Sequence, residues 1–290
     1  VGVGQRLQRV LPAAIAVVLF GAALAVLHRE LAALTWRGLS EDLASTSLAR
    51  LGLALLFTVM SYAVLAGYDL LGFRAIRRRL PAANVVLASF LSYAVAHSIG
   101  FSMVSGASIR YRFYTRWGVT ATELSQIIVS YSVTFWLGVC ALGGLSLIVA
   151  PPASIVGPAV ARWAPALGVL LLLVPVAFVT MTIVRRAPVR VRGLSLPWPT
   201  PGIAVAQVIA SVADWALTAA VLFVLLPPGA VSFWAFVGPF LVAVLAGGAS
   251  HVPGGLGVLD GTLVLLLQPY VSSAELVPRL VVYRVCYYLL

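Results

Sequence analysis

The sequence predicts an all-α polytopic membrane protein with about six full transmembrane helices and two oppositely oriented re-entrant helical hairpins. The first observation behind this fold class is composition. The 290-residue chain is 62% hydrophobic, only 9% of its residues are charged, and its mean hydropathy is +1.06. An average soluble domain has roughly 25% charged residues. So few charges cannot cover a water-exposed surface, which excludes a soluble enzyme and a soluble nucleic-acid-binding domain.

The second observation is a series of long apolar stretches, since a membrane-spanning helix needs roughly 20 apolar residues. Such stretches run near residues 10–28, 51–73, 123–150, 163–184 and 202–227, and another begins near 275. The last stretch is still apolar at Leu290. We therefore expect residues 1–290 to form a single transmembrane domain that belongs to a longer protein.

Two further apolar stretches, residues 84–106 and 233–270, are interrupted by helix-breaking residues. Proline lacks a backbone donor and glycine favours non-helical angles, so we expect the helices to break there. Non-helical backbone at membrane depth must be buried in protein or line a wet cavity. The expected breaks are marked by His97, Gly100 and Gly106 in the first stretch and by His251, Pro253, Gly254, Gly255 and Gly257 in the second.

The third observation is the placement of the basic residues, all of them arginine, which number 19 against 8 acids and give a net charge of +11. They cluster at residues 6–9, 74–79, 110–116 and 185–192. If both broken stretches crossed the membrane, about 7 arginines would lie inside and about 10 outside, against the positive-inside rule. If both are re-entrant, about 13 lie in the cytoplasm and about 5 outside. The arginines therefore predict re-entrant hairpins and a cytoplasmic N-terminus.

The two hairpins would then enter from opposite sides of the membrane, as inverted repeats do. Residues 90–97 and 240–247 both begin with Phe-Leu and lead into a break. Paired interrupted segments in corresponding halves point to the midplane binding site of a transporter.

A polar tract over residues 105–118 adjoins the first break and carries Arg110, Tyr111, Arg112 and Arg116. Arginine forks bind phosphate in bidentate fashion, and tyrosine suits the membrane interface, so these residues are candidates for binding a lipid headgroup. On the tract alone, an ordinary cytoplasmic basic loop is the favoured interpretation.

The second break leads into a predicted helix that starts near Gly257. Its free N–H groups and positive dipole end make an anion site. Asp260, one turn into the helix, either caps this end or binds a cationic group. The break is not a phosphate-binding Walker loop, because the required Lys-Ser/Thr is absent.

Charges inside membrane spans are costly enough to be functional hypotheses. Asp214 lies in the middle of the 202–227 stretch, and Arg284 lies in the last stretch. We expect Arg284 to pair with Asp214 or with Asp260.

Two other acids have structural expectations. Asp69 is expected to interact with Arg74 or Arg77, and Glu123 to lie in the first turn of a helix capped by one of the two threonines before it. His97 and His251 are either proton carriers or hydrogen-bonding groups between helices. We expect no catalytic residue, metal or cofactor in this chain, since no nucleophile motif occurs and both cysteines lie in apolar stretches.

Three motifs together resemble the N-terminal membrane domain of the bacterial lysylphosphatidylglycerol synthetase/flippase family, the multiple peptide resistance factors. They are Ser-Gly-Ala-Ser-Ile-Arg-Tyr-Arg-Phe-Tyr at 105–114, His-Val-Pro-Gly-Gly-Leu-Gly-Val-Leu-Asp at 251–260 and Tyr-Arg-Val-Cys-Tyr-Tyr-Leu-Leu at 283–290. The resemblance implies a flippase domain that moves aminoacylated (lysyl-) phosphatidylglycerol from the inner to the outer leaflet of the plasma membrane. Such transport contributes to resistance against cationic antimicrobial peptides.

The same resemblance implies that Arg110 and Arg112 receive the lipid phosphate and that Asp260 and Asp214 receive the lysyl ammonium groups. The implied partners are the bilayer and a phospholipid, with no nucleic acid bound by this chain, since tRNA would bind only a separate synthetase domain. A homodimer stays open. The alternative is a membrane part that anchors a phosphatidylglycerol lysyltransferase and supplies it with lipid.

Overall fold

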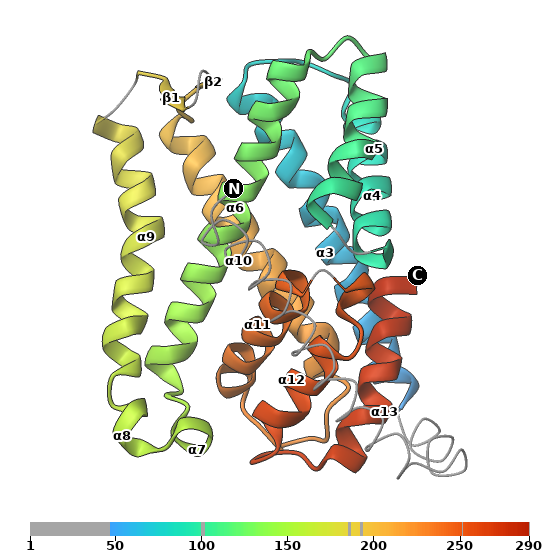
Figure 1. The fold of residues 1–290 in the computed structure, drawn as a ribbon, viewed down its shortest axis with the longest axis vertical. Coiled ribbons are helices and arrows are strands. Elements are labelled where there is room, and N and C mark those ends of the chain that lie inside the picture. Colours follow the sequence, from blue (N-terminus) through green and yellow to red (C-terminus); the bar gives the residue numbers. More distant parts are fainter. Residues whose placement is uncertain (1–46, 100–101, 185–186, 192–193, 251, 290) are drawn as a thin grey trace, which may run out of the picture.

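The computed structural model is almost entirely helical and has the predicted polytopic architecture (Figure 1). It describes residues 47–99, 102–184, 187–191, 194–250 and 252–289. Four helices in this part of the chain are long and apolar enough to cross a membrane. They are α3 (Leu48–Ala75), α6 (Ala121–Val149), α9 (Ala164–Val184) and α10 (Pro201–Phe223). The stretch expected to span near residues 10–28 lies outside the described residues.

The two interrupted stretches form helical hairpins that return to the end of the bundle from which they start. The first consists of α4 (Ala82–Ile99) and α5 (Ser102–Arg116), and the second of α11 (Phe233–Ala249) and α12 (Val258–Leu267). In Figure 1 the first occupies the upper half of the bundle and the second the lower half. The predicted pair of opposed hairpins is therefore confirmed.

The element order of the chain occurs twice, in opposite orientations. A long helix, α3, precedes the first hairpin and α6 follows it; α10 precedes the second hairpin and α13 (Ser273–Arg284) follows it. The helices α3 and α10 pack side by side and run in opposite directions (Figure 1). A final π-helical turn, η2 (Val285–Leu289), contacts both α3 and α4.

Short elements join these units at the two ends of the bundle. The turns α7 (Ala153–Val156) and α8 (Pro158–Ala161) connect α6 to α9, and the antiparallel strands β1 (Val189–Val191) and β2 (Leu194–Leu196) lie between α9 and α10. The connections α3–α4, α5–α6 and α9–α10 all lie at the upper end in Figure 1. The arginine clusters at residues 74–79 and 110–116 therefore lie at or near one end. The cluster at residues 6–9 and three of the four arginines of the cluster at 185–192 are outside the described residues.

Local sequence signals set where the helices begin. Thr120 and Glu123 form a complete capping box at the start of α6, as expected for Glu123. The break before α12 requires glycine, because Gly254, Gly255 and Gly257 have φ angles of 58°, 60° and 78°. These are left-handed values that side chains with a Cβ atom disfavour.

Close contacts between helices depend on glycines that leave no room for a side chain. A Cβ atom on Gly138 of α6 would lie 2.5 Å from Trp215 Cδ1 and 2.6 Å from the carbonyl oxygen of Ser211, both on α10. Gly144 of α6 and Gly168 of α9 meet in the same way, each Cβ position lying within 2.7 Å of the other residue's carbonyl oxygen. The backbones of these helices are therefore in direct contact.

Candidate functional site

A buried ion pair joins the first hairpin to α3. The Nε and NH2 groups of Arg110 on α5 donate hydrogen bonds to the two carboxylate oxygens of Asp69 on α3, over 2.9 and 3.1 Å. The hydroxyl of Tyr114 donates a third hydrogen bond to Asp69, over 2.5 Å. The Arg110 guanidinium also contacts two adjacent aromatic rings, 4.4 Å from the centre of that of Tyr93 and 4.6 Å from that of Tyr131. This cluster connects α3, α4, α5 and α6.

The expectation that Asp69 interacts with Arg74 or Arg77 is wrong. Asp69 lies on the fully buried face of α3, whereas both of those arginines are exposed. A buried carboxylate needs a partner that is buried with it, and Arg110 is 1% exposed. The carboxylate of Asp69 therefore occupies the guanidinium edge that the sequence assigned to a lipid phosphate.

A second ion pair lies at the break of the second hairpin. Arg284 on α13 donates to both oxygens of Asp260 on α12, over 3.0 Å from Nε and 2.6 Å from NH2. Its NH1 group also donates to the backbone carbonyl of Gly254, over 2.9 Å. Asp260 in turn accepts a hydrogen bond from the N–H of Gly257, 3.0 Å away, and so caps α12. One of the two expected partners of Arg284, Asp260, is therefore the one observed.

The two ion pairs differ in exposure. The side chains of Arg284 and Asp260 are 16% and 6% exposed, whereas those of Arg110 and Asp69 are 2% and 0% exposed. Arg284 also binds the irregular backbone at Gly254, which a helix would have kept in its own hydrogen bonds. The pair at the second break can therefore be reached by a ligand more readily than the first.

Asp214 is buried without an arginine partner in the part of the chain that the structure describes. Its carboxyl oxygens lie 2.9 Å from the hydroxyl of Ser61 and 3.1 Å from that of Tyr68, both on α3. The Ser61 hydroxyl is also within 3.3 Å of the hydroxyls of Thr218 and Tyr287. The structure thus separates Asp214 from Arg284 and places it among hydroxyl groups.

The remaining predicted site residues fall into three groups. Tyr111, Arg112 and Arg116 are exposed on the half of α5 that leads to the arginine-rich end. Gly106, expected at the first break, lies instead within α5, where a Cβ atom would be 3.4 Å from that of Ala96 on α4; its role is close helix packing. Gly100 and His251 lie outside the described residues, as do the side chains of His97 and Pro253.

The hydroxyl groups around the buried charges were not predicted from the sequence. A signal for them exists, since Ser61 and Tyr68 are seven residues apart on α3, and Asp214 and Thr218 are four apart on α10. Both spacings place polar groups on one helix face. Polar residues aligned on one face of an apolar helix predict contact with another helix rather than with lipid.

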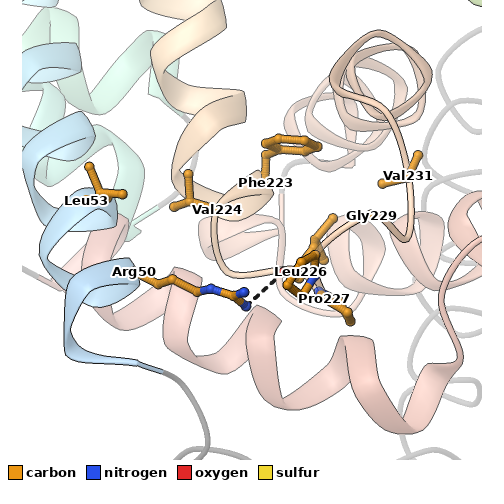
Figure 2. A pocket seen from close by; sticks show the side chains of 9 residues that line it. Arg50, Leu53, Phe223, Val224, Leu226, Pro227, Gly229 and Val231 are labelled. Atoms are coloured by element: carbon orange, nitrogen blue, oxygen red, sulfur yellow. Dashed lines mark hydrogen bonds between the residues drawn. The ribbon is translucent and has the colours of Figure 1, made fainter.

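A cavity of about 270 Å³ lies at the opposite end of the bundle from the arginine-rich connections, where α3 begins and α10 ends (Figure 2). Its walls are mostly apolar, and Arg50 reaches across to donate a hydrogen bond to the carbonyl of Leu226 over 3.3 Å. None of the buried aspartates lines this cavity. The buried ion pairs and this cavity are therefore separate features of the described structure.

Comparisons with known proteins agree with a membrane protein. The uncharacterized protein slr0712 of Synechocystis is 32% identical over 98% of this chain and 89% of its own length. The inner membrane protein YbhN of Escherichia coli is 29% identical over 79% of this chain and 73% of its own length. A phosphatidylglycerol lysyltransferase of Staphylococcus aureus is 25% identical over 99% of this chain, which spans only 33% of that enzyme. No protein-family model matches the chain.

Proposed function

The chain belongs to the same family as slr0712 of Synechocystis, and we propose that it moves a phospholipid headgroup across the bacterial plasma membrane. The proposed cargo is aminoacylated phosphatidylglycerol, the lysyl form above all, carried from the inner to the outer leaflet. The similarity to phosphatidylglycerol lysyltransferase supports this class of lipid. Outward movement would place positive charge on the cell surface and so weaken the binding of cationic antimicrobial peptides.

The observation that carries the proposal is the partly exposed ion pair of Arg284 and Asp260 at the second break. A lysylated headgroup has a phosphate anion and ammonium cations. Separating a buried ion pair is costly when either charge is left alone. A headgroup with both charges replaces both partners at once, since its phosphate binds Arg284 and its ammonium binds Asp260.

This exchange also explains why only one of the two ion pairs would bind cargo. The Arg110–Asp69 pair is closed by the Tyr114 hydroxyl and by the rings of Tyr93 and Tyr131, which both lie against the guanidinium. The Arg284 guanidinium is shared between Asp260 and the carbonyl of Gly254, and the ring of Tyr288 lies farther from it, at 5.5 Å. We therefore assign Arg110 to holding the hairpin in place and Arg284 to the headgroup.

The exposed arginines of α5 would collect the lipid before it reaches the break. Arg112 and Arg116 lie on the half of α5 near the arginine-rich end, which we place in the cytoplasm by the positive-inside rule. Their guanidiniums match the geometry of a lipid phosphate, and the nearby Tyr111 suits the headgroup region.

The test is lipid movement in liposomes that contain the purified protein and lysylphosphatidylglycerol. We expect Asp260→Asn and Arg284→Gln each to slow the appearance of the lysyl lipid in the opposite leaflet by about tenfold or more, since each leaves one charge without its exchange partner. Glu275→Gln is the matched control, because Glu275 is an exposed acid one helix away from the break.

A second arm of the experiment tests whether transport depends on the ammonium groups of the lipid. Unmodified phosphatidylglycerol lacks the ammonium groups, so the wild-type protein should move it more slowly than the lysyl form. Equal rates for the two lipids, or unchanged rates in both variants while the proteins elute as folded monodisperse particles, would contradict the proposal.

The alternative is that this chain anchors and feeds a lysyltransferase. The lengths of the two proteins support this alternative, because the chain spans about a third of the similar phosphatidylglycerol lysyltransferase. In that case the variants would lower total lysyl-lipid synthesis in cells that express the longer enzyme, whereas a flippase defect lowers only the fraction in the outer leaflet.

A further inference from the structure

We propose that Asp214 is a proton-binding site, and that its uptake and release of a proton drive the headgroup movement proposed above. The site is a cluster of one carboxyl and four hydroxyls, from Ser61, Tyr68, Thr218 and Tyr287. It lies where α3, α10 and η2 meet, and therefore where the two inverted units contact one another.

The geometry of the cluster determines how many protons it needs. Five contacts of hydrogen-bonding length join its five groups. Two involve the carboxyl of Asp214, at 2.9 Å from Ser61 and 3.1 Å from Tyr68. The other three form a closed ring, with 3.1 Å between Ser61 and Thr218, 3.3 Å between Ser61 and Tyr287, and 3.0 Å between Thr218 and Tyr287. Each hydrogen bond uses one proton, so hydrogen bonds over all five contacts use five.

An ionised carboxylate leaves the cluster one proton short. Ser61 and Tyr68 would then donate to Asp214, and only Thr218 and Tyr287 would have protons left for the three contacts of the ring. A protonated carboxyl completes the set. Asp214 then donates to Ser61, Tyr68 donates to the other carboxyl oxygen, and Ser61, Thr218 and Tyr287 donate around the ring.

The surroundings also favour a bound proton over a bound metal ion. Asp214 is 6% exposed, and a buried carboxylate without a cation is costly. Its oxygens lie at hydrogen-bonding distance from two hydroxyls, and the described residues contain no group of three or more His, Cys, Asp or Glu side chains that could hold a metal ion. The ionisable groups that face it are tyrosines: Tyr68 on α3, Tyr93 on α4 and Tyr287 in η2.

Loss of the proton changes the contact between the repeats. In the protonated state, the carboxyl of Asp214 on α10 would donate to Ser61 on α3 across their 2.9 Å contact, and Ser61 belongs to the hydroxyl ring that includes Tyr287 in η2. Deprotonation removes one of these hydrogen bonds and leaves a negative charge between α3 and α10. The lost hydrogen bond and the buried charge weaken the contact between the two repeated units at this point. Protonation is thereby coupled to alternating access. This coupling rests on the proposed function.

Infrared spectroscopy tests the proton site without any transport. In detergent-solubilised protein at neutral pH we expect a carbonyl-stretch band of a protonated carboxyl, shifted in heavy water. Asp214→Asn, which keeps the shape of the protonated acid, should remove it. Ser61→Ala should shift the band, because a direct partner of the carboxyl is lost. Glu275→Gln, an exposed acid, should leave it unchanged.

An absent band in the wild-type protein, or a band that survives in folded Asp214→Asn, would overturn the proton site. Liposomes with an imposed pH difference test the coupling. For one proton per lipid, one pH unit should shift the ratio of lysyl lipid between leaflets by up to about tenfold in wild type and not in Asp214→Asn. Lipid movement that ignores the gradient overturns the coupling. An infrared band from protonated Asp214 together with no lipid movement in liposomes would support the proton site and overturn the proposed function.

Discussion

Both carboxylate oxygens of Asp69 on α3 accept hydrogen bonds from the guanidinium of Arg110 on α5, and the side chains are 0% and 2% exposed. Removing one partner of such a pair leaves an uncompensated buried charge. We expect Arg110→Met to lower the free energy of unfolding by roughly 3–5 kcal/mol. Chemical unfolding in detergent micelles, followed by tryptophan fluorescence, measures this loss.

The double variant Asp69→Leu with Arg110→Met removes both charges and should recover a large part of the loss. The exposed pair of Arg78 and Glu123, 3.9 Å apart, is the surface control. Arg78→Ala should cost no more than about 1 kcal/mol. A similar cost for Arg78→Ala and Arg110→Met would contradict the structural role of the buried pair.

The crossing of α6 and α10 provides a second prediction. Gly138→Ala should destabilise the protein by about 1–3 kcal/mol, because its Cβ atom would meet Trp215 at 2.5 Å. Gly143→Ala on the same helix is the matched control, since its Cβ atom would meet only Leu241 Cδ1, at 3.4 Å. Melting temperatures of the two variants in one detergent compare them directly, and equal values would argue against the close crossing.

Two helix starts with threonine caps provide a third prediction. Thr120 accepts a hydrogen bond from the N–H of Glu123, whereas the cap of α10, Thr200, makes no such side-chain bond. Thr120→Ala should therefore cost about 1 kcal/mol, and Thr200→Ala much less. Thermal unfolding of both variants measures the difference. The reverse order of effects would show that the α6 cap is unimportant.

A fourth prediction concerns the side of the membrane that the arginine-rich end faces. With Cys140 and Cys286 replaced by alanine, an impermeant thiol reagent should label Glu275→Cys in intact cells and Arg112→Cys only after lysis. Both positions are exposed; Arg112 lies in the C-terminal half of α5 and Glu275 in the first turn of α13. The C-terminal end of α5 and the start of α13 lie toward opposite ends of the bundle (Figure 1). Labelling of Arg112→Cys in intact cells would reverse the proposed orientation.

The architecture could be predicted because it depends on features that the sequence carries locally. Apolar length gives the spans, to within a few residues: α10 covers Pro201–Phe223 against an expected 202–227. The glycines and the proline near residue 254 give the second break, and α12 begins at Val258, directly after Gly257, as expected. The placement of the arginines predicts the opposed hairpins, because the positive-inside rule indicates on which side of the membrane each connecting segment lies.

The pairing of the buried charges could not be predicted to the same extent. Asp69 and Arg110 are 41 residues apart, and only the packing of the first hairpin against α3 brings them together. Arg284 had two acids within plausible reach, and the fold alone decides for Asp260. Charge placement limits the possible partners, whereas the choice among them is made by tertiary packing.

The helix α9 packs sparsely, yet it sets the relative orientation of the two repeated units. Few of its residues are buried, and its backbone meets α6 where Gly168 faces Gly144. It nevertheless provides a single extra crossing between the two repeated units. Each hairpin returns to its starting side and adds no crossing. The two crossings by α3 and α6 therefore bring the chain back to the side on which α3 begins. Without α9, the second unit would start on that side and run in the same direction as the first. Both breaks would then open toward one compartment. One lipid-facing helix thus fixes the parity of the chain, and that parity gives the two sides of the membrane one hairpin each.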